Sequence, residues 1–187
     1  MIPFPNKKYQ IIYADPPWKQ TKGGLRECRP NQKRGLDYQT LNLNDIRDIV
    51  DKTPKTKIHT LFLWTIDKYL HKAEELFKDY KLHARFVWDK GNGIAPAFTV
   101  RYSHEYLLWL YKPKMISIPK NQRGKYLTIL RERATTHSRK PYVARKMIED
   151  LYPVQLKIEL FARERFLGWD AWGNETDKFT EKQQELF

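Results

Sequence analysis

Residues 9–18 of the 187-residue chain read YQIIYADPPW, and this stretch indicates the fold. The run YQIIYA is apolar on both faces of an extended chain, as in a parallel strand buried between two layers of helices. Two prolines then end the strand, because proline lacks the N–H group that a sheet ladder requires. An acid, two rigid carbonyls and an indole are therefore expected at the carboxyl end of a strand, where open α/β sheets bind ligands.

Outward from this stretch, apolar runs alternate with helical patterns. The sequence predicts further strands at 58–65, 84–90, 104–112 and 156–162, with a short closing segment at 168–175. It predicts helices at about 44–52, capped by Asn42 or Asn44, from an Asp67 cap to Tyr80, and from Pro141 to Tyr152–Pro153. Strands alternating with helices indicate a wound α/β sheet in a single domain over residues 1–187.

Two basic segments, at about 19–38 and 112–139, interrupt this pattern and are interpreted as loop insertions at the surface of the domain. The chain holds 35 Lys and Arg against 22 Asp and Glu, a formal net charge of +13. An aromatic content of 14% argues against disorder despite that charge. The excess of positive charge favours a nucleic-acid partner, and the alternative is a soluble protein with solvated basic loops.

Cysteine and histidine usage argues against other classes of protein. The one cysteine, Cys28, can form no internal disulfide and no cysteine-based zinc site, so a reducing, cytoplasmic setting is expected. The five histidines show no paired metal-binding spacing, so no metal is expected. The longest apolar run, near TLFLWTI, is too short for a membrane span, and no signal peptide is evident.

The residues DPPW can support one kind of chemistry. A carboxylate at Asp15 and a fixed carbonyl at Pro16 can accept both hydrogens of an exocyclic amine. An aromatic amine is a weak nucleophile, so two acceptors that aim its lone pair and stabilise its growing positive charge would favour methylation. Trp18 can stack on the base, which would first be flipped out of a duplex. The alternative is that the prolines only turn the chain and Trp18 packs in the core.

YADPPW resembles the signature of the S-adenosylmethionine-dependent N6-adenine methyltransferases, the family that includes the writer of N6-methyladenine in eukaryotic messenger RNA. The resemblance extends from about residue 9 to 175, and the chain looks like a bacterial or phage member of the family. The further matching stretches, in order, are LFLWT (61–65), VWDKGNG (87–93), RYSHEYLLW (101–109), THSRKP (136–141), KIELFAR (157–163) and GWDAWGNE (168–175).

This resemblance implies a permuted Rossmann-like methyltransferase fold, with the catalytic strand first and the cofactor strand near the C-terminus. It assigns S-adenosyl-L-methionine as the cofactor. Asp15 would contact the cofactor's amino group and the target amine, and the carbonyl of Pro16, stiffened by Pro17, would accept the second amine hydrogen. Trp18 would stack on the adenine.

The resemblance also places residues further along the chain. Lys140 matches a position that contacts the cofactor carboxylate or the substrate, and its place at a helix start suits an anion. Arg163 matches the cofactor side, and Asn174 with Glu175 would hold the ribose hydroxyls, although some relatives have Gln in place of Glu175. Glu105 matches a position near the target base.

The expected activity is methyl transfer to N6 of adenine in DNA. Alternatives are the same reaction on RNA, a catalytically inactive partner subunit, or methylation of cytosine N4 or a small amine. The sequence leaves open a monomer or a homodimer. In addition to Trp18, Glu105 and Lys140, the residues expected to contact the nucleic acid are Lys19, Lys22, Lys33, Arg34 and Arg101.

Overall fold

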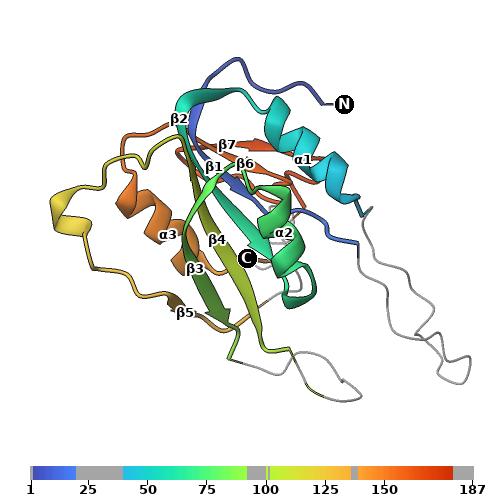
Figure 1. The fold of residues 1–187 in the computed structure, drawn as a ribbon, viewed down its shortest axis with the longest axis vertical. Coiled ribbons are helices and arrows are strands. Elements are labelled where there is room, and N and C mark those ends of the chain that lie inside the picture. The colour runs from blue at the N-terminus through green and yellow to red at the C-terminus, as the bar shows by residue number, and fades with distance from the viewer. Residues whose placement is uncertain (1, 20–39, 92–99, 101, 136–138, 179–187) are drawn as a thin grey trace, which may run out of the picture.

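The computed structural model describes residues 2–19, 40–91, 100, 102–135 and 139–178. Within these residues one seven-stranded sheet has the order β5-β3-β4-β2-β1-β6-β7 (Figure 1). Its strands are β1 (Tyr9–Ala14), β2 (Lys55–Thr65), β3 (Lys81–Asp89), β4 (His104–Lys112), β5 (Ile129–Arg131), β6 (Lys157–Leu160) and β7 (Trp169–Trp172).

The strand directions bring many chain segments to one edge of the sheet. Within the described residues β4 is antiparallel to both of its neighbours, and every other pairing is parallel. The carboxyl ends of the parallel strands and the amino end of β4 therefore lie at the same edge, which we call the catalytic edge. The arrangement confirms the predicted Rossmann-like α/β fold, with β1 next to β6 in the sheet although β1 comes first in the chain.

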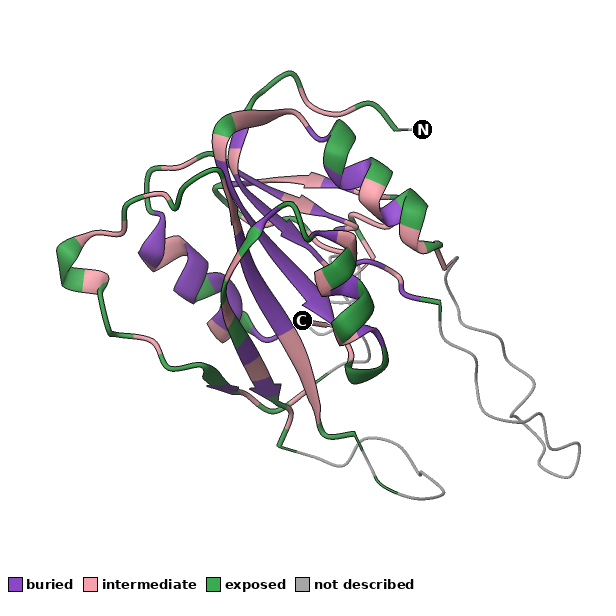
Figure 2. Cartoon of the chain, in the orientation of Figure 1, coloured by how far each residue is buried: buried purple, intermediate pink, exposed green. Residues whose placement is uncertain are grey.

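Helices cover both faces of the sheet. The α-helices are α1 (Leu43–Lys52), α2 (Leu70–Leu76) and α3 (Tyr142–Leu151). Ile12 and Ala14 of β1 belong to the hydrophobic core beneath α1 and α2, whereas Ile11 and Tyr13 belong to the core beneath α3. Figure 2 shows the central strands buried and the outer faces of the helices exposed, which explains why β1 carries apolar side chains on both faces, with Gln10 the one polar residue.

One predicted helix start is confirmed and another is wrong. The side chain of Asn42 accepts a hydrogen bond of 2.9 Å from the N–H of Asp45, so Asn42 caps α1. Asp67 caps no α-helix, because it lies within a 3₁₀ turn (Asp67–Tyr69), and α2 begins only at Leu70. The N–H of Tyr69 bonds to the carbonyl of Ile66 in this tighter turn.

Strand β5 lies within the segment that the sequence predicts as a basic loop. It has three residues and pairs in parallel with the end of β3. Only Leu130 is buried, while Ile129 and Arg131 on either side are exposed, so burial of its own side chains stabilises the strand little. Pairing with β3 therefore decides the structure of this stretch.

Among the residues described, no helix combines the length and apolarity that crossing a membrane requires. The same residues hold no group of three or more side chains arranged to bind a metal ion.

Candidate active site

Four charged side chains meet at the catalytic edge. Asp15 follows β1, Lys90 follows β3, Glu105 lies at the start of β4, and Lys140 precedes α3. The ammonium of Lys140 lies 2.8 Å from Oδ2 of Asp15 and 3.2 Å from Oε2 of Glu105. Lys90 lies 2.6 Å from the other oxygen of Glu105. The sequence-predicted residues Asp15, Glu105 and Lys140 thus form one cluster, whose side chains are only 14–17% exposed.

Burial and mutual contact set the charges of this cluster. Burial raises the pKa of Asp15, and the nearby Glu105 adds to that effect, although Lys140 opposes it. Burial opposes the charge of Lys140, but its two carboxylate partners prevail and raise its pKa. Burial likewise opposes the charge of Glu105, but Lys140 and Lys90 lower its pKa. Lys140 and Glu105 therefore stay ionised at neutral pH, and Asp15 is the acid of this cluster whose pKa is raised.

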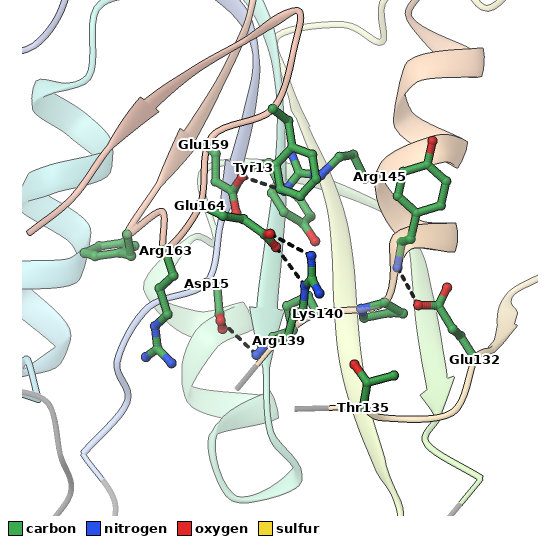
Figure 3. Close-up of a pocket in the computed structure, with 14 residues that line it drawn as sticks. Tyr13, Asp15, Glu132, Thr135, Arg139, Lys140, Arg145, Glu159, Arg163 and Glu164 are labelled. Atoms are coloured by element: carbon green, nitrogen blue, oxygen red, sulfur yellow. Dashed lines mark hydrogen bonds and ion pairs between the residues drawn. The ribbon is translucent and has the colours of Figure 1, made fainter. Parts of the chain in front are cut away.

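A cavity of about 300 Å³ opens beside Asp15 and Lys140. Its walls come from the ends of β1 and β6, from the start of α3 and from the chain after β6. In the view of Figure 3 the carboxylate of Asp15 points toward Lys140 within this lining. Arg163 and the aromatic rings of Phe161 and Phe166 also line the cavity.

The ends of β6 and β7 close tightly next to this cavity. The N–H of Ala162 bonds to the carbonyl of Trp172 at 3.1 Å. A Cβ atom at Gly173 would lie 2.9 Å from the nitrogen of Ala162, so only glycine fits there without a shift. The approach brings Arg163 and Glu175 within 3.6 Å of each other. Two predicted cofactor-binding residues are therefore neighbours.

Glu175 and Asn174 differ in their surroundings. Glu175 also contacts Lys178 at 2.7 Å, and Asn174 is exposed. The charges around the cavity complement a ligand that carries both signs. Lys140 and Arg163 suit a carboxylate, whereas the carboxylates of Asp15 and Glu175 suit an amine and sugar hydroxyls.

The carbonyls of Pro16 and Pro17 in the DPPW turn accept hydrogen bonds from different backbone N–H groups. The carbonyl of Pro17 accepts a bond of 3.0 Å from the N–H of Leu41. The carbonyl of Pro16 accepts one of 2.9 Å from the N–H of Trp18. Because a carbonyl oxygen has two lone pairs, Pro16 retains one for a further donor.

The indole of Trp18 packs inside the protein. It is 4% exposed, stacks on Tyr69 with ring centroids 5.3 Å apart, and donates a 3.0 Å bond to the carbonyl of Trp64. This is the core packing that the sequence left open as the alternative for Trp18. Stacking of Trp18 on a base stays a prediction, and it would require the indole to leave both partners.

The first turn of α3 offers little to a bound anion. Its N–H groups at Tyr142 and Val143 donate bonds of 2.7 and 2.8 Å to the carboxylate of Glu132. Glu132 thus occupies donors that an anion at a helix start would use. The N–H groups of Tyr142 and Val143 are therefore taken, and an anion at this helix start would depend on side-chain cations such as Lys140.

Four predicted nucleic-acid contacts, Lys22, Lys33, Arg34 and Arg101, lie outside the described residues. Lys19 is exposed, and its carbonyl accepts a hydrogen bond from the hydroxyl of Tyr69.

Sequence reasoning missed several charged groups at the site. Lys90 comes directly after β3, as Asp15 comes directly after β1, and this place at the carboxyl end of a strand was the available signal. Arg145 is 6% exposed and lies 2.6 Å from Glu159, and both residues line the cavity. A basic residue on the apolar face of the helix at 142–151 signals such a buried pair.

An open α/β sheet with an acid, a carbonyl lone pair and a cavity lined by charges of both signs at one edge fits a Rossmann-like methyltransferase. A family model described as MT-A70 matches residues 9–175. The chain belongs to the MT-A70 family.

Three relatives place the chain within that family. It is 32% identical over 188 residues to the "Type II methyltransferase M.MunI" of Mycoplasma sp., covering 91% of this chain and 79% of that protein. It is 27% identical to the "Putative N(6)-adenosine-methyltransferase MT-A70-like" of Medicago truncatula, covering 90% of this chain and 26% of that protein. It is 25% identical to the human "N(6)-adenine-specific methyltransferase METTL4", covering 92% of this chain and 38% of that protein.

Proposed function

We propose that this protein transfers a methyl group from S-adenosyl-L-methionine to N6 of adenine in DNA. The observation that carries the proposal is the ionisable Asp15 in the lining of a charged cavity, followed directly in the chain by Pro16, whose carbonyl keeps a lone pair for a further donor. Two relatives whose names specify a Type II methyltransferase and an N(6)-adenine-specific methyltransferase support the reaction class.

S-adenosyl-L-methionine, when bound, supplies a methyl group on a positively charged sulfur. The cavity suits it because Lys140 and Arg163 can hold a carboxylate while Glu175 can accept hydrogen bonds from ribose hydroxyls. Asn174, which precedes Glu175, is exposed at the same strand end and can join that contact.

Asp15 and Pro16 act on the amine of the target base. Lys140 contacts Oδ2 of Asp15, so Oδ1 can accept one amine hydrogen while the spare lone pair of Pro16 accepts the other. Two acceptors hold both hydrogens in place and so aim the nitrogen lone pair at the incoming methyl group. They also stabilise the positive charge that the nitrogen gains as the new bond forms. Asp15 must be ionised for this role, because a protonated carboxyl offers a competing donor.

A polyanionic substrate fits the charge of the protein. The formal net charge is +13, and Arg131 and Arg133 are exposed at the end of β5, on the catalytic edge. These cations suit phosphates on either side of an extruded adenine, in addition to the predicted contacts of the basic segments 19–38 and 112–139.

The test is methyl transfer from labelled cofactor to duplex DNA, with structured RNA as the parallel substrate. We expect label at N6 of adenine in DNA, and no label with Asp15→Ala, whose DNA affinity should stay close to that of the wild type. Label in RNA alone would overturn the choice of DNA. Label at cytosine N4, or DNA binding without any transfer, would overturn adenine methylation itself.

A further inference from the structure

Lys90 is fixed in place more firmly than a surface lysine. Its N–H bonds to the carbonyl of Ser103 at 3.0 Å, and its own carbonyl accepts a bond of 3.1 Å from Ala134. Its ammonium lies 5.3 Å from the centre of the Trp88 ring, and the side chain is 14% exposed. Holding a charge in such a position is unfavourable without a partner, and that partner is Glu105.

The distances divide the charges of the cluster into two pairs. Glu105 lies closer to Lys90, at 2.6 Å, than to Lys140, at 3.2 Å. Lys140 lies closer to Asp15, at 2.8 Å, than to Glu105. Lys90 therefore supplies the main counter-charge of Glu105, and Lys140 remains the main counter-charge of Asp15.

We propose that Lys90 is a positioning residue for methyl transfer, which acts by holding Glu105 so that Lys140 stays on Asp15. The inference rests on the proposed function for its consequence in catalysis. Lys90 itself touches Glu105 and not the reacting groups, so its effect reaches Asp15 through Glu105 and Lys140.

Removal of the Lys90 charge leaves two carboxylates to share one ammonium. Lys140 would move toward Glu105, and Asp15 would lose part of its main counter-charge. The other charged groups that act on Asp15 do not replace what is lost, because Arg163 attracts it already and Glu159 on β6 repels it. The cluster should then bind a proton at higher pH, with Asp15 as the main site.

The experiment compares the pH dependence of kcat/KM for the wild type, Lys90→Met and Lys90→Arg. Arg85→Met is the matched control, since Arg85 lies on β3 and pairs with Glu74 away from the cluster. We expect the acid limb of the Lys90→Met profile to move up by about one pH unit, the lower end of the effect that an adjacent charge has on a carboxyl pKa. Lys90→Arg should restore the wild-type profile, and Arg85→Met should leave it unshifted.

A second readout does not depend on catalysis. Carbon-13 NMR titration of the aspartate carboxyls, with the Asp15 signal assigned through Asp15→Asn, should show the same upward shift in Lys90→Met. Absence of methyl transfer in the wild type would overturn the proposed function while this titration still decided the positioning role. A folded Lys90→Met protein with an unshifted Asp15 titration would overturn the positioning role alone, and loss of activity without a shift would make Lys90 only structural.

Discussion

Replacement of Trp18 by phenylalanine separates the two roles that this indole could have. In the structure Trp18 is buried, stacks on Tyr69 and donates a hydrogen bond to the carbonyl of Trp64. Phenylalanine keeps an aromatic ring for stacking but removes that bond. A structural role therefore predicts lower stability for Trp18→Phe, whereas a role confined to base stacking predicts little change.

The magnitude follows from the contacts that are lost. Loss of one buried hydrogen bond of 3.0 Å should lower the free energy of unfolding by about 1–2 kcal/mol, since the carbonyl acceptor loses a partner. For a chain of 187 residues this corresponds to a fall in Tm of roughly 2–8 °C. Trp18→Ala, which also removes the ring from the core, should cost about 3–5 kcal/mol.

The assay is thermal unfolding followed by circular dichroism, together with KM for the methyl-accepting DNA. Trp172→Phe is the matched control, because Trp172 stacks on Phe4 and donates an equivalent 3.0 Å bond to the carbonyl of Ile2. We expect both variants to lose similar stability and Trp18→Phe to keep its KM. An unchanged Tm for Trp18→Phe, with a KM raised about 5-fold or more in Trp18→Ala, would refute this reasoning and restore the stacking role.

Three further predictions concern the strand ends, the acid and the basic loop. Gly173→Ala should destabilise the protein by about 1–3 kcal/mol in the same thermal assay, because its Cβ would lie 2.9 Å from the backbone of Ala162; an unchanged Tm would contradict that close approach. Methyl transfer should fall as pH decreases through the pKa of Asp15, which burial raises above the ordinary value of about 3.9, because the protonated carboxyl adds a competing donor and no longer stabilises the positive charge on the amine; a profile that stays flat down to pH 4 would exclude Asp15 as the titrating group. Neutralising Lys22, Lys33 and Arg34 of the first basic segment together should weaken DNA binding and reduce the slope of log K against log salt by up to about 2.7. An unchanged slope would argue against a role for these three residues in DNA binding.

The parts of the fold that sequence reasoning predicted well are those decided locally. The bounds of β1 and β4 match the prediction, because each is an apolar run with a proline or charge at its end. The Asn42 cap is likewise a local hydrogen bond. The predicted helix start at Asp67 was wrong because an acid before an apolar pattern is typical of an α-helix and of a 3₁₀ turn alike. Strand β5 was not predicted because its extended structure depends on pairing with β3.

In the site, too, sequence reasoning predicted what short local motifs decide and missed what distant contacts decide. Asp15, Glu105 and Lys140 were predicted through a resemblance whose motifs are short and contiguous, and the structure brings them together. The burial of Trp18 depends on Tyr69 and on the carbonyl of Trp64, about fifty residues away, so no local pattern could show it. The contact of Lys90 with Glu105 depends on the antiparallel pairing of β3 and β4, which the periodicity of neither strand reveals.

That antiparallel pairing also separates catalysis from the length of the connection between β3 and β4. Asp89 pairs with His104, and the N–H of Lys90 bonds to Ser103, so both ends of this connection are tied together next to Glu105. Residues inserted or deleted between the two ties would leave Lys90 and Glu105 where they are. The length of this connection can therefore change without rebuilding the charged cluster around Asp15.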